Sequence, residues 1–287
     1  MRFCNDFNDY ELIDAEGGQR LERWKDIILI RPDPQVIWQS QRNNPLWNDA
    51  HAIYHRSNSG GGYWEPLKKV PDVWSVNFCD LTFRLKPMGF KHTGLFPEQA
   101  VNWQFMQEKI KNANRPVNVL NLFAYTGGAT IACLQAGATV THVDASKGMV
   151  SWAKENAVAS CLGDKPVRWL VDDCLKFVKR EIRRGNKYDG IVMDPPSYGR
   201  GPNGEVWKLE QQINELLSEV GKIISDEPLF FILNSYTGGL SPTILNYMVK
   251  TLVVPHRQGE VFTDEIGLKI TDKNMILPCG NTTIWTK

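Results

Sequence analysis

Short apolar runs alternate with helix-length amphipathic segments from about residue 117 onward. Almost every residue in these runs is apolar, as expected of strands that are covered on both faces. Such alternation is typical of βαβ units built around a parallel sheet. The five runs predicted as strands are 117–123, 138–144, 167–173, 188–196 and 228–235. The pattern therefore predicts a doubly wound α/β domain.

The two ends of the chain do not show this alternation of strands and helices. Residues 259–270 and 274–286 read as two further strands joined by a polar turn at 271–274, which predicts a hairpin. Residues 1–95 contain short alternating runs and little helical periodicity. We therefore expect a small β-rich N-terminal domain over 1–95 and a larger α/β domain over 96–287.

Composition limits the class of protein. Hydrophobic residues make up 42% and charged residues 23%, as in ordinary globular proteins. No apolar run approaches the roughly 20 residues that span a bilayer, so we expect a cytoplasmic protein without membrane partners. The six cysteines form no CxxC pair, and His51 and His55 have no acidic neighbour to complete a metal site, so we expect neither disulfides nor metal. With a net charge of +1, any affinity for nucleic acid must come from a local patch.

The residues that follow each predicted strand are the candidates for binding, because ligands of doubly wound sheets collect beyond the carboxyl ends of the strands. A glycine turn at 123–130 leads into a helix whose N-terminal amides can hold an anionic group. Asp144 can accept hydrogen bonds from ribose hydroxyls. Asp172 and Asp173 can accept from the exocyclic amine of a purine. Each feature alone is more often a cap or a turn, but their succession at strand ends predicts a nucleotide site.

The fourth predicted strand ends in Asp194, Pro195, Pro196, Ser197 and Tyr198. Proline fixes φ near −65° and removes a donor, so this segment is stiff and keeps its carbonyls available as acceptors. Asp194 and the Pro195 carbonyl can accept from an amine, and Tyr198 can offer a face for stacking. For an isolated Asp-Pro-Pro the plain interpretation is a strand stopped by a turn. Its position after three other candidate strand ends favours a catalytic role for Asp194, Pro195, Pro196 and Tyr198.

Taken in order, the motifs VLNLFAYTGG, the strand ending at Asp144, VDDCLKF and VMDPPSYG resemble the class I S-adenosylmethionine-dependent methyltransferases. The similarity is greatest to the branch of the bacterial large-subunit ribosomal-RNA cytosine-C5 methyltransferases, and it includes HTGLFPEQ at 92–99. The resemblance implies a Rossmann-like seven-stranded sheet whose last strand is antiparallel, and S-adenosyl-L-methionine as cofactor, with S-adenosyl-L-homocysteine as product.

The resemblance also assigns cofactor contacts. The methionine part would be held by Phe123, Ala124, Tyr125, Thr126, Gly127 and Gly128. The ribose would be held by Asp144 with Ala145 and Ser146, and the adenine side by Asp172 and Asp173. Further contacts would come from Phe96, Pro97, Gln99 and Asp194.

One departure from that branch concerns the target atom. The C5 enzymes attack the pyrimidine with a cysteine thiolate that follows the fifth strand. Here the corresponding residues are Asn234, Ser235 and Tyr236. The Asp-Pro-Pro segment resembles the motif of amino-group methyltransferases, in which a substrate lone pair attacks the methyl group directly, although C5 enzymes carry it too. The target atom therefore stays open between an exocyclic amine and carbon 5.

A basic stripe is predicted on a helix over 174–187. At 100° per residue its cations cover an arc of about 140°, and they are Lys176, Lys179, Arg180, Arg183, Arg184 and Lys187. The stripe can follow a phosphate backbone or can be an ordinary solvated face. We expect a methyltransferase acting on a nucleobase of RNA, with ribosomal RNA as the expected partner. The alternatives are a protein side chain or small molecule as substrate, and a non-catalytic cofactor-binding module.

Overall fold

The structure is a computed structural model that describes residues 1–57, 61–237 and 239–287. The chain forms two compact units, each made of two segments. Unit 1 comprises Met1–Ala100 and Ile266–Cys279, and unit 2 comprises Val101–Glu265 and Gly280–Lys287. The short C-terminal segment of unit 1 is the tip of a hairpin made of β15 (Glu260–Ile270) and β16 (Met275–Thr286), which turns at 271–274 as the sequence predicts.

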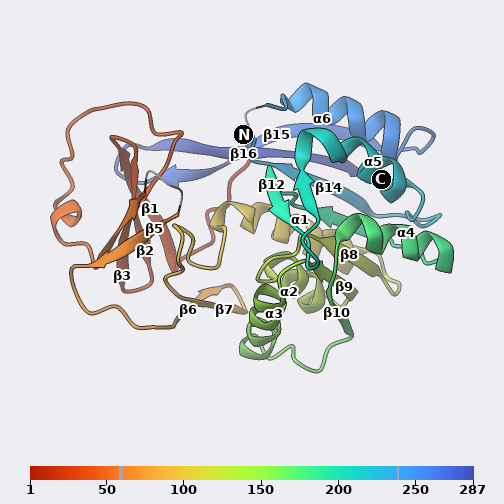
Figure 1. Cartoon of the computed structure of the whole chain (residues 1–287), viewed down its shortest axis with the longest axis horizontal. Helices are drawn as coiled ribbons and strands as arrows, with labels where there is room; N and C mark the ends of the chain where they lie inside the picture. The colour runs from red at the N-terminus through yellow and green to blue at the C-terminus, as the bar shows by residue number, and fades with distance from the viewer. Residues whose placement is uncertain (58–60, 238) are drawn as a thin grey trace. The chain divides into compact units, whose positions relative to one another are not determined.

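The sheet of unit 2 has the predicted doubly wound order. Its described strands, from one edge, are β10 (Val167–Val171), β9 (Thr139–Asp144), β8 (Asn118–Leu122), β11 (Gly190–Met193), β14 (Phe230–Ser235), β16 and β15. Neighbours from β10 to β14 are parallel, whereas β16 runs antiparallel to β14. The order reverses at β8, whose neighbours β9 and β11 lie on opposite sides. The expected Rossmann-like sheet with a reversed strand is confirmed (Figure 1).

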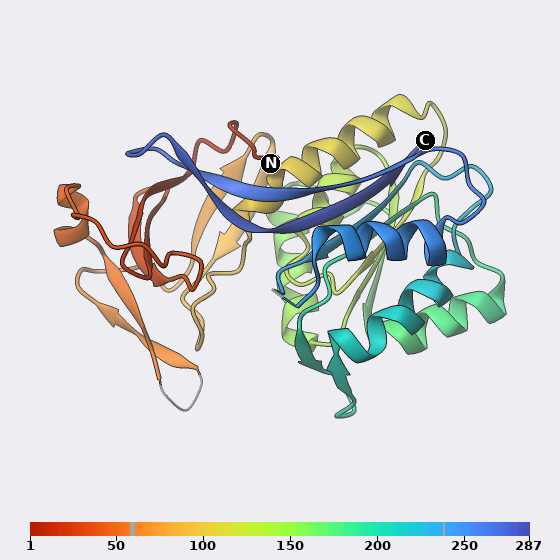
Figure 2. The same ribbon diagram turned by 90° about the horizontal axis from the view of Figure 1, so that it is seen from above.

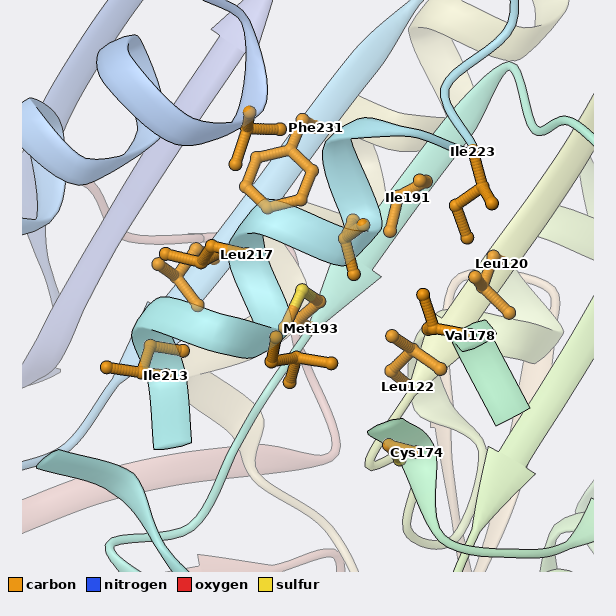
Figure 3. Close-up of a cluster of buried hydrophobic side chains, with 14 of the residues drawn as sticks. Leu120, Leu122, Cys174, Val178, Ile191, Met193, Ile213, Leu217, Ile223 and Phe231 are labelled. Atoms are coloured by element: carbon orange, nitrogen blue, oxygen red, sulfur yellow. The ribbon is translucent and has the colours of Figure 1, made fainter. Parts of the chain in front are cut away.

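Helices cover both faces of this sheet, which explains why its central strands β8, β11 and β14 are almost completely buried. On one face, side chains such as Leu122, Met193 and Phe231 pack in a buried cluster (Figure 3). The helices of that face are α4 (Cys174–Arg184), α5 (Leu209–Gly221) and α6 (Pro242–Met248), followed by the π-helical turn η3 (Val249–Val253), and Figure 2 shows the three α-helices on the same side of the sheet. On the other face, Asn121 of β8 donates to Thr130 of α2. Helix α1 (Ala100–Asn112) precedes β8, α2 (Gly128–Gln135) connects β8 to β9, and α3 (Lys147–Ala159) follows β9.

Unit 1 is built mainly of strands, in agreement with the predicted β-rich N-terminal region. Neighbouring strands, in order, are β1 (Tyr10–Glu16), β2 (Gln19–Trp24), β3 (Ile27–Pro32), β4 (Ala52–Arg56) and β5 (Gly62–Pro66), and β6 (Trp74–Phe78) pairs with β7 (Leu81–Leu85). Two 3-10 turns, η1 (Pro45–Asn48) and η2 (Pro97–Gln99), complete the unit. In its interior Glu22 accepts from Arg31 and from the Tyr10 hydroxyl, so the buried charge is compensated.

Two kinds of site are not seen in the described part of the chain. None of its helices is long and apolar enough to cross a bilayer. Nor do three or more His, Cys, Asp or Glu side chains gather there in a way that would hold a metal ion. His51 instead accepts from the Ile28 amide, and His55 lies on strand β4 beside Glu65.

Candidate active site

The turn after β8 has an unusual backbone. Phe123 and Tyr125 both adopt positive φ, at 55° and 50°, and Gly127 caps the N-terminus of α2 at φ 86°. A Cβ at Gly127 would lie 2.9 Å from the Ala153 Cβ, and one at Gly128 would lie 2.6 Å from Cζ2 of Trp103. These two positions need glycine because helix neighbours approach the backbone closely. The turn therefore presents the first amides of α2 at the end of β8, where an anionic group can be held.

Asp144 connects the ends of β8 and β9. One carboxylate oxygen accepts from the Tyr125 amide and the other from the Ser146 amide, each at 2.8 Å. Burial raises the pKa of Asp144 even though both amides lower it. The Ser146 hydroxyl caps α3 by accepting from the Met149 amide. Because each carboxylate oxygen has a second lone pair, Asp144 can still accept from a pair of hydroxyls.

The two acids after β10 have different partners. Asp173 is the N-cap of α4 and accepts from the Lys176 amide at 2.9 Å. Asp172, just before the helix, forms an ion pair with Arg180, about two turns into α4, and the Asp172 amide donates to the Asp144 carbonyl at 3.0 Å. The Asp173 carboxylate is thus held by the first turn of α4, and the Asp172 carboxylate by the Arg180 guanidinium.

The segment after β11 leads into a small hairpin that sequence analysis missed. The Asp194 amide donates to the Leu122 carbonyl at 3.4 Å, which extends the pairing with β8. The two prolines are followed by β12 (Tyr198–Arg200), which pairs antiparallel with β13 (Val206–Lys208). Tyr198 is 54% exposed on this hairpin. The stretch PNGE at 202–205 could have predicted this hairpin, because Pro-Asn-Gly between two short alternating runs is typical of a tight turn.

Trp207 of this hairpin is a further residue at the site. Its Nε1 donates to the Pro196 carbonyl at 2.6 Å, and its ring lies 5.0 Å from the Phe123 ring. The Pro196 carbonyl therefore already accepts a hydrogen bond within the protein. The acceptors that the sequence suggests for a substrate are Asp194 and the Pro195 carbonyl.

The fourth and fifth strand ends are neighbours. Met193 of β11 pairs with Leu233 of β14, so the residues just beyond them lie side by side. The Asn234 side-chain oxygen accepts from Asn102 at 3.1 Å and from the Thr282 hydroxyl at 2.7 Å, all three side chains being buried. Asn234 is thus held in a polar network inside unit 2.

The structure brings together most of the predicted site residues. β8, β9, β10 and β11 are adjacent and parallel, so the segments after them share one edge of the sheet. The residues gathered there are Phe123–Gly128, Asp144–Ser146, Asp172–Asp173 and Asp194–Tyr198. Phe96, Pro97 and Gln99 lie in and just before η2, which belongs to unit 1, and their contact with a cofactor stays a prediction.

The basic stripe is largely neutralised. Helix α4 ends at Arg184 because Gly185 takes up a left-handed conformation, so Lys187 lies beyond the helix and the predicted end at 187 is wrong. Four of the remaining cations face carboxylates: Lys176 faces Glu205, Lys179 faces Glu215, Arg180 faces Asp172 and Arg184 faces Glu181. These ion pairs favour the interpretation of the stripe as a solvated face.

The fold and the site together define a Rossmann-like α/β protein with a nucleotide-type binding edge. Residues 50–230 match the family model of S-adenosylmethionine-dependent methyltransferases. A solved methyltransferase of that kind from Agrobacterium tumefaciens is 34% identical, with a TM-score of 0.93 over 97% of this chain and 90% of that chain. The chain belongs to the S-adenosylmethionine-dependent methyltransferase family. It is an enzyme with S-adenosylmethionine as its methyl donor.

Other relatives are more distant or match only in part. SMU.776, solved in complex with S-adenosylhomocysteine, shares the fold at 17% identity, with a TM-score of 0.75 over 98% of this chain and 76% of that chain. Two curated relatives are named ribosomal RNA large subunit methyltransferase K/L. The one from Shewanella frigidimarina is 34% identical over 50% of this chain and 20% of its own length, and the one from Pseudoalteromonas atlantica is 35% identical over 58% and 23%. The match thus spans about a fifth of those proteins.

Proposed function

We propose that this enzyme methylates a nucleobase of RNA, with ribosomal RNA as the substrate, by direct in-line transfer. The names of the two curated relatives support RNA as the substrate class. A ribosomal RNA substrate in turn makes this a cytoplasmic enzyme. The observation that carries the proposal is the stiff Asp194–Pro196 segment, which follows β11 directly between the ends of β8 and β14.

The edge of the sheet fits the donor molecule. In this proposal the turn from Phe123 to Gly128, with the N-terminus of α2, holds the methionine carboxylate. Asp144 accepts from the ribose hydroxyls, beside Ala145 and Ser146. Asp172 and Asp173 lie toward the adenine. When bound, S-adenosylmethionine supplies an electrophilic methyl group on its sulfonium.

The role of the protein in the transfer is alignment. Asp194 and the Pro195 carbonyl accept from the target amine and orient its lone pair, and the exposed Tyr198 stacks on the base. Holding two reactants in the right geometry can be worth roughly 7–11 kcal/mol of barrier. An amine needs no covalent nucleophile, whereas carbon 5 needs a thiolate, and the end of β14 carries Asn234 and Ser235. An exocyclic amine is therefore the favoured target.

Residues 1–95 are proposed to act as a substrate arm, with 96–287 as the catalytic domain. In support, Tyr63 on β5 is 62% exposed and stacks on His55 at 5.1 Å between ring centroids. Exposed aromatic side chains of this kind are suitable for stacking on unpaired bases.

The test is methyl transfer by the purified chain from tritiated S-adenosylmethionine to protein-free ribosomal RNA. We expect label in RNA, and mass spectrometry of the nucleosides then identifies the base and the atom. Asp194→Ala should abolish turnover while the affinity for S-adenosylhomocysteine stays within about threefold, because alignment rather than cofactor binding is lost. Label only in protein or in small molecules would contradict the RNA proposal. Turnover that survives Asp194→Ala would remove the assigned role of that carboxylate.

A further inference from the structure

Trp207 contacts both halves of the proposed active site. Its Nε1 donates to the Pro196 carbonyl at 2.6 Å, and its ring lies 5.0 Å from Phe123 at an interplanar angle of 51°. Phe123 opens the cofactor turn in its strained positive-φ conformation. Trp207 itself is 7% exposed and belongs to the buried cluster that fills one face of the sheet. One rigid side chain therefore joins the cofactor turn to the Asp-Pro-Pro segment.

The sequence of the Asp-Pro-Pro segment explains why such a contact is needed. Pro195 and Pro196 have no amide hydrogen, so they cannot donate to a neighbouring strand. The hydrogen bond from the Asp194 amide to the Leu122 carbonyl of β8 is already long, at 3.4 Å. Beyond the prolines, the Leu209 amide donates to the Ser197 carbonyl at 3.1 Å. The indole N–H supplies a donor between these two backbone bonds, at the carbonyl of Pro196.

The hairpin that carries Trp207 is also held by contacts other than the hydrogen bond to Pro196. Tyr198 pairs with Lys208, and Glu205 forms an ion pair with Lys176 of α4 at 2.5 Å. A Cβ at Gly201 would lie 2.3 Å from a Glu205 carboxylate oxygen, so the turn packs tightly on itself. The indole thus projects from a strand that pairs with β12 and that follows a residue held by α4, which makes it a stable support for Pro196.

We propose that Trp207 is a positioning residue for methyl transfer. By holding the Pro196 carbonyl it sets the position of Asp194 and the Pro195 carbonyl relative to the cofactor turn. The inference rests on the proposed function, because it takes Asp194 as the group that aligns the target.

The experiment removes the N–H and keeps the ring. Trp207 is replaced by phenylalanine and, by site-specific incorporation, with benzothienylalanine, which has the shape of tryptophan and no N–H. The control is Trp285→Phe, because Trp285 is also buried in the same cluster and its Nε1 has no hydrogen-bond partner in the described structure. Single-turnover methyl transfer, S-adenosylhomocysteine affinity and Tm are measured for each.

We expect the benzothienylalanine protein to keep its Tm and its S-adenosylhomocysteine affinity within about threefold, and to lose about 10- to 100-fold in single-turnover rate, since small misplacements can cost about 100-fold. Trp207→Phe should lose at least as much, and Trp285→Phe should retain its rate. A benzothienylalanine protein with the wild-type rate would overturn the inference. So would a rate loss in the Trp285→Phe control as large as that at Trp207.

A separate measurement distinguishes failure of the proposed function. If the wild type binds S-adenosylhomocysteine but transfers no methyl to RNA, the proposed function fails. The inference is then decided by carbon-13 shifts of the Pro196 carbonyl and by the ring signals of Phe123. Changes at both on loss of the indole N–H support the link, and an unchanged Phe123 overturns it.

Discussion

Asp144 offers the sharpest separation of a binding role from a structural one. Its two carboxylate oxygens accept from the amides of Tyr125 and Ser146 at 2.8 Å. Hydrogen bonds to charged groups contribute about 1.5–3 kcal/mol each. Burial nevertheless raises the pKa of this carboxyl, which means that the folded protein disfavours its charged form relative to the unfolded chain. A neutral side chain of the same shape therefore loses one acceptor and gains relief from desolvation.

Asp144→Asn should therefore leave the free energy of unfolding within about 1 kcal/mol of wild type, since the two effects offset each other. Asp144→Ala loses both acceptors and should cost about 1–3 kcal/mol, or roughly 2–10 °C in Tm. The affinity for S-adenosylhomocysteine should fall in both variants, by about tenfold for Asn and about 100-fold for Ala, because one or both ribose hydroxyls lose an acceptor.

Calorimetric titration with S-adenosylhomocysteine and thermal denaturation check these values. Asp164→Asn is the matched control, because Asp164 is exposed in the loop before β10. If Asp144→Asn bound S-adenosylhomocysteine as tightly as wild type, the assigned ribose contact would be refuted. If Asp144→Ala left Tm unchanged, the role of the carboxylate in joining the ends of β8 and β9 would be refuted.

Three further predictions concern packing and charge in unit 2. Gly128→Ala places a Cβ 2.6 Å from the Trp103 ring and should cost about 1–3 kcal/mol in thermal or denaturant unfolding through overpacking. Burial lowers the pKa of His142 to about 3, so between pH 6.5 and 3 the unfolded chain binds the proton and the folded one does not. The free energy of unfolding should therefore decrease as the pH is lowered through that window, by up to about 1.4 kcal/mol per pH unit. In His142→Gln, Tm measured against pH should depend less steeply on pH. Lys176→Glu should slow methyl transfer by repelling Glu205 of the hairpin, and the charge-swapped double variant should recover the rate in the tritium assay.

The sequence allowed the sheet and the order of its strand ends to be predicted, because both depend on local patterns. Apolar runs mark the strands, and Ser146 marks the start of α3. Contacts between distant segments were not predictable. The ion pairs of α4 with Glu205 and Glu215 depend on where α5 and the hairpin pack, and they changed the interpretation of the basic stripe. The end of the helix at Arg184 could have been found, since a glycine at 185 is a common helix terminator.

The positive φ values at Phe123 and Tyr125 illustrate the same limit within one turn. Neither phenylalanine nor tyrosine is a residue type that indicates a left-handed conformation. The conformation is stabilised by contacts with distant residues: Asp144 accepts from the Tyr125 amide, and Trp207 packs on the Phe123 ring. The partners lie 19 and 84 residues away in the chain, so no local pattern shows them.

Several of the site residues support the fold and are also assigned to the chemistry, and this has a consequence for every substitution at the site. Asp173 caps α4, and the Pro196 carbonyl accepts from the indole of Trp207. Removing the Asp173 side chain should cost about 1 kcal/mol through the cap alone, so a loss of activity there does not by itself identify a substrate or cofactor contact. Asp194 is the more decisive position. It follows the last residue of β11, so a short polar replacement leaves the paired strand intact and acts on the proposed acceptor.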